Sequence, residues 1–259
     1  MANKTLVLAA VAGFSMSVSA AAADISAPFF GASPYIKGEL GWMSPDGSGG
    51  FWNAPDPTTP TVSFNVDGSD EAFGSLAFGL DWGNGLRGEL GLFATGTSDV
   101  TGPCSGASDG SLCSTHADIT QASVSTRGAM ASIYYSPLEA QGNSGAFQPF
   151  FVVGLGAAEN DMGNWTRVNP SATRPTRTFS GDKNVDFAWS IGAGFSYAVN
   201  NPGQFPIILE TSLRYFDYGK AEGGSTVLSD NGNGPRTPFT FDNKATVLSF
   251  ALRIPLRRN

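Results

Sequence analysis

The feature that most constrains this chain is a regular alternation of large apolar residues with small or polar ones, clearest over residues 187–197. Successive side chains of a β-strand point to opposite faces, so this pattern predicts a strand with one apolar face. Glycine and serine on the other face fit a narrow interior, whereas a large apolar face fits lipid. The apolar face carries Phe187, Trp189, Ile191, Ala193, Phe195 and Tyr197, and the other face carries Ala188, Ser190, Gly192, Gly194 and Ser196.

Seven more segments show the same period, and most have the roughly 9–11 residues that a tilted strand needs to cross a bilayer. The eight segments are 35–42, 73–82, 86–94, 128–135, 147–157, 187–197, 207–216 and 245–256. Phe93, Phe150, Ile208 and Phe216 are apolar exceptions expected to fill the inside. The other large residues are expected to face outward: Ile36, Leu40, Trp42, Leu76, Phe78, Leu80, Trp82, Leu90, Leu92, Ile133, Tyr135, Phe151, Val153, Leu155, Ile207, Leu209, Leu213, Tyr215, Leu248, Phe250, Leu252 and Ile254.

The small faces also carry every charge of these segments, four acidic and four basic. An eight-stranded barrel is just wide enough inside to be filled by side chains. Because isolated buried charges are costly, the eight are expected to pair and plug the lumen, leaving at most a small or gated path. The predicted lumen charges are Lys37, Glu39, Asp81, Arg87, Glu89, Glu210, Arg214 and Arg253.

The connections alternate strictly between long and short, and the long ones are expected to be structureless loops. The long connections are 43–72, 95–127, 158–186 and 219–244, and the short ones are 83–85, 136–146 and 198–206. Aromatic residues near the strand ends suggest two interfacial girdles. Trp82, Tyr135, Phe147 and Tyr197 lie toward the short turns, and Trp42, Trp189 and Tyr215 toward the long loops. The sequence therefore predicts an all-β fold: an eight-stranded antiparallel up-and-down transmembrane barrel with four long external loops and three short periplasmic turns.

The composition agrees with a barrel and excludes other classes. Charged residues make up 14% of the 259 residues, against about 25% in an average protein. The net charge of −7 gives no support to nucleic-acid binding, and the 33 glycines disfavour a helical bundle.

The N-terminus is typical of an export signal. Lys4 precedes an apolar stretch over 6–18, and a run of small residues ends at Ala23. A membrane anchor is the alternative, but the stretch is short and contains serine and glycine. We expect residues 1–23 to be a cleaved signal peptide and 24–259 to form one barrel domain.

Five stretches, in this order and spacing, resemble the small eight-stranded outer-membrane β-barrel family, the porin-like or opacity-type surface proteins of Gram-negative bacteria. The resemblance covers nearly all of 24–259, but the ending Leu256-Arg257-Arg258-Asn259 departs from the aromatic residue with which family members usually end. The matching stretches are Tyr35-Ile-Lys-Gly-Glu-Leu-Gly-Trp42, Gly79-Leu-Asp-Trp-Gly-Asn-Gly-Leu-Arg-Gly-Glu-Leu-Gly91, Gln148-Pro-Phe-Phe-Val-Val-Gly-Leu-Gly156, Trp189-Ser-Ile-Gly-Ala-Gly-Phe-Ser-Tyr197 and Leu213-Arg-Tyr-Phe-Asp-Tyr-Gly219.

This resemblance implies a monomer in the bacterial outer membrane, with outer-membrane lipid, lipopolysaccharide and the barrel-assembly machinery as partners. The implied role is structural or surface-interactive, through envelope integrity or loop-mediated adhesion to host or cell-surface ligands. A narrow porin, a lipid-modifying enzyme and a soluble lipocalin-like binder are the alternatives. No catalytic residue, cofactor or metal is expected.

Candidate sites outside the strands are few. Cys104 and Cys113 are the only cysteines, and in an exported protein this spacing favours a disulfide over a metal pair or free thiols. His116, the only histidine, could act as a catalytic base with Ser114 and Asp118, but an exposed loop residue is the simpler interpretation.

Two groups of charged residues in the long connections remain. The first connection carries Asp46, Asp56, Asp67, Asp70 and Glu71, whose spacing fits no compact calcium loop and favours a solvated acidic surface. The third carries Arg167, Arg174 and Arg177, which would contact lipopolysaccharide phosphates or pair with Glu159, Asp161 and Asp182.

Overall fold

The computed structural model describes residues 31–113, 119–168, 176–199, 207–229 and 232–256, nearly all of them in antiparallel strands. Helix α2 (Pro137–Ala140) has four residues, and no helix in this part of the chain is long and apolar enough to span a membrane. The strands are β1 (Ser33–Pro45), β2 (Ser48–Asn53), β3 (Val62–Gly68), β4 (Glu71–Asp81), β5 (Leu86–Thr95), β6 (Ser98–Ala107), β7 (Ile119–Tyr135), β8 (Phe147–Met162), β9 (Trp165–Val168), β10 (Arg177–Phe179), β11 (Asp182–Val199), β12 (Ile207–Glu222) and β13 (Thr237–Pro255).

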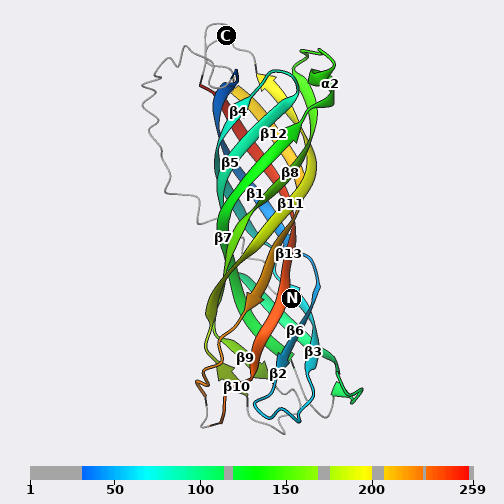
Figure 1. Cartoon of the computed structure of the whole chain (residues 1–259), viewed down its shortest axis with the longest axis vertical. Coiled ribbons are helices and arrows are strands. Elements are labelled where there is room, and N and C mark those ends of the chain that lie inside the picture. Colours follow the sequence, from blue (N-terminus) through cyan, green and yellow to red (C-terminus); the bar gives the residue numbers. More distant parts are fainter. Residues whose placement is uncertain (1–30, 114–118, 169–175, 200–206, 230–231, 257–259) are drawn as a thin grey trace, which may run out of the picture.

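Eight of these strands close into a ring, which we call the main barrel (Figure 1). Its order is β1-β4-β5-β7-β8-β11-β12-β13, and β13 pairs back onto β1. Every pair is antiparallel, and each of the eight predicted segments lies within a different one of these strands, exceeding its bounds by at most one residue. The predicted eight-stranded antiparallel barrel is therefore confirmed.

The inside and outside faces of the main barrel follow the predicted alternation. On β11 the side chains of Phe187, Ile191 and Phe195 are exposed, whereas Ala188 and Ser190 are buried inside. Because a one-residue slip of a strand would exchange its two faces, this agreement excludes such a slip in the predicted segments. Three of the four apolar exceptions, Phe93, Phe150 and Phe216, are buried in the interior, and Ile208 is half-buried.

The long connections differ from the prediction, because much of their length is strand rather than loop. Strands β2, β3, β6, β9 and β10 each continue a main-barrel strand after a two-residue interruption. Their pairing keeps the order of the ring: β2 joins β13 to β3, β3 joins β6, β6 joins β7, and β9 joins β7 to β10. The thirteen strands are thus eight long ones, five of which are interrupted at 46–47, 69–70, 96–97, 163–164 and 180–181.

These continuations build a second section of barrel, which we call the extension. It comprises the five short strands and the adjoining ends of β7, β8, β11, β12 and β13, seen at the bottom of Figure 1. Its alternation has the opposite polarity: in β3, Val62, Phe64 and Val66 are buried, while the residues between them are more exposed. The pattern that predicted the main-barrel strands, with large apolar residues on the outer face, does not occur in these short strands. They were therefore predicted as loops.

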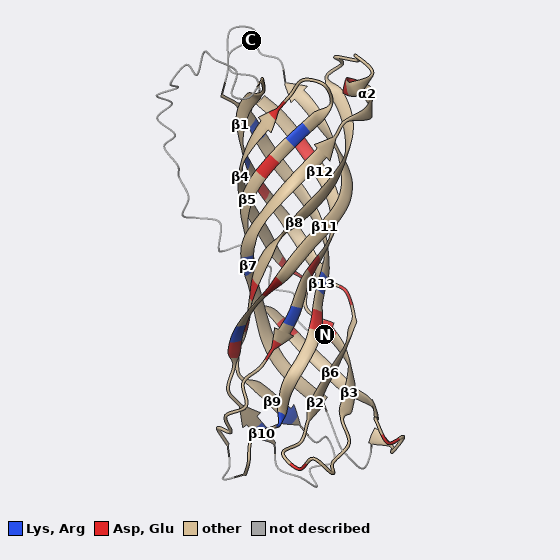
Figure 2. Cartoon of the chain, in the orientation of Figure 1, with Lys and Arg blue, Asp and Glu red and all other residues tan. Residues whose placement is uncertain are grey.

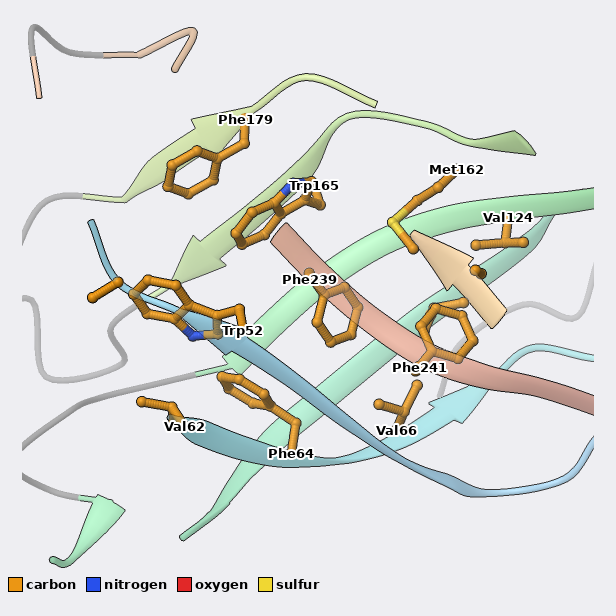
Figure 3. Close-up of a cluster of buried hydrophobic side chains, with 13 residues drawn as sticks. Trp52, Val62, Phe64, Val66, Val124, Met162, Trp165, Phe179, Phe239 and Phe241 are labelled. Carbon is orange, nitrogen blue, oxygen red and sulfur yellow. The ribbon is translucent and has the colours of Figure 1, made fainter. Parts of the chain in front are cut away.

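The extension has a hydrophobic core of its own (Figure 3). At its centre, Trp165 stacks on Phe179 at 4.1 Å between ring centroids and lies 6.4 Å from Trp52. The indole Nε1 of Trp165 donates a hydrogen bond of 2.9 Å to the carbonyl oxygen of Gly224. The buried members are Trp52, Ala54, Val62, Phe64, Val66, Val100, Val124, Met162, Trp165, Phe179, Ala221, Phe239 and Phe241.

A bulge in β12 marks the junction of the two sections. The register with β13 shifts between Asp217 and Lys220, and Gly219 has φ +78°, a conformation that favours glycine. The side-chain amide of Asn160 donates to the carbonyl oxygens of Tyr218 and Lys220, each at 2.9 Å. This buried asparagine therefore satisfies the backbone groups that the bulge leaves without a strand partner.

Candidate functional site

The candidate site is the interior of the main barrel, where the structure places all eight predicted lumen charges. They come from β1, β4, β5, β12 and β13, and seven of them are buried, while Asp81 is half-buried near the short-turn end. Residues two apart on a strand share a face, which is why Lys37 with Glu39 and Arg87 with Glu89 enter together. Figure 2 shows the charged positions as isolated red and blue segments on otherwise uncharged strands.

Glu210 is the centre of the charge network. One of its carboxylate oxygens accepts from Arg87 Nη1 at 2.6 Å and from Arg253 Nε at 2.9 Å. The other lies 4.0 Å from the ammonium of Lys37. Arg253 also reaches Asp81 at 2.9 Å, so the network extends to the short-turn end of the barrel.

A second carboxylate, Glu89, completes this network. It accepts a 2.5 Å contact from the Lys37 ammonium and a 2.9 Å hydrogen bond from the Tyr35 hydroxyl. The Lys37 ammonium donates also to the Tyr134 hydroxyl at 2.6 Å, and Arg87 lies over the Tyr134 ring at 4.8 Å. Each buried charge here has an opposite charge or a polar group beside it, as low-dielectric burial requires.

Glu39 and Arg214 are arranged differently from the other six. In the described part of the chain, neither has an oppositely charged side chain within 4.0 Å. Glu39 accepts from the hydroxyls of Ser75, at 2.9 Å, and Ser249. Arg214 donates to Ser190 at 2.6 Å and to Ser132 at 3.4 Å. Six of the predicted lumen charges thus form direct ion pairs, and two are held by hydroxyls.

An aromatic layer fills the interior between these charges and the extension. The Phe216 ring lies 5.5 Å from that of Phe73 and 6.3 Å from that of Phe93, and it stacks on Tyr218 at 5.3 Å. Met43, Met130, Ala158, Ala188, Ala245 and Val247 pack in the same buried cluster. The sequence predicted only that Phe93 and Phe216 fill space; their meeting with Phe73 and Tyr218 depends on the ring closing.

The exterior of the main barrel is an apolar band with aromatic ends. At the short-turn end, Trp82, Tyr135, Phe147 and Tyr197 are exposed, as predicted for one girdle. At the other end Trp42 is exposed, and the rings of Trp189 and Tyr215 lie 5.6 Å apart.

Charged side chains resume on the outer wall immediately beyond this band. Arg127 pairs with Glu159 at 2.6 Å, and Lys183 pairs with Asp161 at 2.6 Å. Glu159 and Asp161, two of the three acidic residues predicted to pair with the arginines of the third connection, therefore form ion pairs with other residues. Arg167 and Arg177 lie over the rings of Trp52 and Phe179, both at 5.2 Å. Arg174 is outside the described residues.

The remaining candidates lie in the extension. Cys104 and Cys113 are joined as a disulfide with their Cα atoms 5.8 Å apart, beside the tip that follows β6. His116, Ser114 and Asp118 fall outside the described residues. The acidic residues of the first connection are spread out: Asp67 is in β3, Glu71 begins β4, Asp46 and Asp70 lie in interruptions, and Asp56 lies in the turn between β2 and β3. No three potential metal ligands cluster within the described ranges. Asp56 accepts hydrogen bonds from the backbone and hydroxyl of Thr58, which lower the pKa of its carboxyl.

Comparison with known proteins gives structural likeness without sequence likeness. No protein-family model and no curated protein sequence matches the chain. The chain is similar to the structure of the outer membrane protein OprG from Pseudomonas aeruginosa, with 15% identity, a TM-score of 0.48 and coverage of 86% of this chain and 96% of that one. It is also similar to neisserial surface protein A, with 13% identity, a TM-score of 0.41 and coverage of 87% and 99%.

A third similar structure is Ail, the attachment invasion locus protein of Yersinia pestis, in complex with the heparin analogue sucrose octasulfate. Its identity is 8%, its TM-score is 0.32, and the match covers 85% of this chain and 99% of that one. The eight-stranded barrel is established by the strand pairing of this chain itself.

Proposed function

We propose that the protein is a closed barrel of the bacterial outer membrane with a structural and surface-interaction role. The main barrel would cross the bilayer, and the extension would hold its turns above the lipid as a surface for adhesion or recognition. The observation that carries this proposal is the filled interior: charges, an aromatic layer and the core of the extension follow one another along the barrel axis.

The outer wall supports insertion in lipid. Large apolar side chains such as Leu40, Leu92 and Phe250 are more than 60% exposed, which a water-facing barrel would not tolerate around its whole circumference. A soluble ligand-carrying barrel would have the opposite polarity, with an apolar cavity inside and a polar wall outside. Outer-membrane lipid, lipopolysaccharide and the assembly machinery are therefore the partners we propose.

The interior supports a closed state over the porin alternative. Two cavities inside the main barrel have volumes of about 30 and 10 Å³, and a third of about 20 Å³ lies at the junction with the extension. A cavity needs roughly 10–15 Å³ to hold one water molecule. Each of these three cavities therefore has room for one or two waters, which supports a closed interior.

The extension supports a role at the cell surface. Strands of 16–19 residues exceed the roughly 9–11 needed to cross the bilayer, so β8, β11, β12 and β13 continue well beyond it. The packed core would hold the extension in one conformation, unlike a set of free loops. Its turns, including the disulfide-bonded one after β6, would be held at fixed positions.

Single-channel recording tests the closed interior. Refolded protein in a planar bilayer is expected to give no stable conductance steps, because the aromatic layer and the extension core exclude water. Heat-modifiable migration on a gel verifies that the inserted protein is folded. Reproducible ion-selective steps from folded protein would contradict the proposal and favour the narrow porin.

Labelling of intact cells tests the location and orientation. Thr58→Cys is in the turn between β2 and β3, and Ser144→Cys is in the short turn after α2; both positions are exposed. A membrane-impermeant maleimide is expected to label the first in intact Gram-negative cells and the second only after the outer membrane is opened. Labelling of Ser144→Cys alone in intact cells would reverse the orientation, and equal labelling of soluble protein from both variants would exclude membrane insertion.

A further inference from the structure

Glu39 and Arg214 are two buried opposite charges without a direct ion pair in the described chain. Glu39 is 5% exposed and Arg214 is 6% exposed, and each side chain is hydrogen-bonded to serine hydroxyls. A hydroxyl stabilises a buried charge less than an opposite charge does, so this arrangement leaves much of the burial cost uncompensated. The other six lumen charges meet this cost by direct pairing.

A cavity of about 30 Å³ lies against both side chains. Serine hydroxyls and a second carboxylate contribute to its polar wall, through Ser75, Ser132 and Glu89. The Nε–H of Arg214 is buried and has no hydrogen-bond partner within the protein. A buried donor left without a partner costs about 1–3 kcal/mol, so a water that reaches this nitrogen from the cavity would be strongly favoured.

Glu39 also borders a second cavity, of about 10 Å³, on the side facing the charge network. This cavity is lined by Lys37, Glu210 and Ser249, among others. Glu39 therefore lies between two small polar spaces, one shared with the network and the other shared with Arg214.

We propose that ordered water fills the larger cavity and bridges Glu39 to Arg214, which gives these two charges the interaction that the other six obtain by direct pairing. A buried water commonly makes about three hydrogen bonds, and this cavity is bordered by Arg214, by the carboxylates of Glu39 and Glu89 and by the hydroxyl-bearing Ser75 and Ser132. The volume suits about two waters and is too small for an organic ligand. Phe73, Phe93 and Phe216 border the same cavity and would form the apolar boundary of the water site. This inference concerns the interior alone and does not depend on what the turns bind.

Nuclear magnetic resonance of the folded protein in detergent micelles tests the bridge directly. The Arg214 Nε–H resonance, assigned by its loss in Arg214→Lys, is expected to show a cross-relaxation peak with a long-lived water. A visible Nε–H without a water contact would overturn the proposal. The same measurement after exchanging sodium for choline at constant ionic strength tests for a bound cation. A change in the Nε–H signal would indicate that the cavity holds sodium rather than water and would overturn the proposal.

A double-mutant cycle tests the coupling. In urea unfolding from lipid vesicles, Glu39→Gln and Arg214→Met together are expected to be less destabilising than the sum of the single changes, by at least about fivefold in the unfolding equilibrium constant. As a matched control, Arg214→Met with Asp81→Asn is expected to be additive within about twofold, because Asp81 does not border the cavity. Additivity of the Glu39 pair would overturn the bridge. If Arg214→Met does not fold, Arg214→Lys, which keeps the charge, takes its place.

Discussion

Glu210→Gln is expected to destabilise the folded barrel by about 3–5 kcal/mol, the cost of removing one partner from a buried charge network. The change is nearly isosteric, so its effect is electrostatic rather than a cavity effect. It removes the carboxylate that Arg87 and Arg253 contact at 2.6 and 2.9 Å, and it leaves the Lys37 ammonium with Glu89 alone. Urea unfolding from lipid vesicles, followed by the gel shift of the folded barrel, measures the effect.

A matched exposed pair provides the control for this prediction. Glu159→Gln breaks the Arg127 pair at the same 2.6 Å, but the Arg127 side chain is 68% exposed and the pair faces outward. Solvent screening limits such pairs to about 0–1 kcal/mol, so this variant should unfold close to the wild type. A compensating Arg87→Met in the Glu210→Gln background should recover part of the loss. Equal stability of Glu210→Gln and Glu159→Gln would contradict the buried network.

Trp165→Ala is expected to remove about 3–5 kcal/mol from the stability of the extension, because it opens a large cavity in its core. Trp165 is fully buried, stacks on Phe179 at 4.1 Å and bonds to the Gly224 carbonyl. Hydrogen exchange resolved along the chain is the measurement. In the wild type the amides of β2, β3 and β6 should be protected, and in the variant they should exchange faster, while β4 and β5 keep their protection.

Leu228→Ala is the control for the extension. Leu228 lies in the connection between β12 and β13, and its side chain is exposed, so removing it should change stability by about 0.5 kcal/mol or less. Rapid exchange of β2, β3 and β6 in the wild type would show that the long connections are loops after all. Loss of protection throughout the main barrel in Trp165→Ala would show instead that the two sections unfold as one.

Sequence patterns predicted the main barrel well because a lipid-facing strand carries its signal locally. The alternation within 187–197 identifies the outward face of β11 without any knowledge of its neighbours. The same parity argument placed Lys37 with Glu39 and Arg87 with Glu89 on the inside. The signal is strong here because lipid demands large apolar residues at every second position.

The extension was missed because its strands obey the ordinary rule of water-soluble sheets, with apolar residues inside. In β3 the apolar positions are Val62, Phe64 and Val66, and these three are all that lie between the turn after β2 and the interruption at 69–70. Short strands that begin and end at breaks look like loops with scattered apolar residues. Pairing with β2 and β6, which lie elsewhere in the sequence, is what makes this segment a strand.

By itself, the sequence determined the number of barrel strands, the face that each presents to lipid and the identity of the charges inside, because period-two alternation is a property of consecutive residues. The tertiary structure alone decided which charges meet. Ring closure brings Glu210 between Arg87 and Arg253, 123 and 43 residues away along the chain, and leaves Glu39 and Arg214 facing a shared cavity. Contacts across a closed barrel depend on the stagger of all eight strands at once, and no local pattern contains that information.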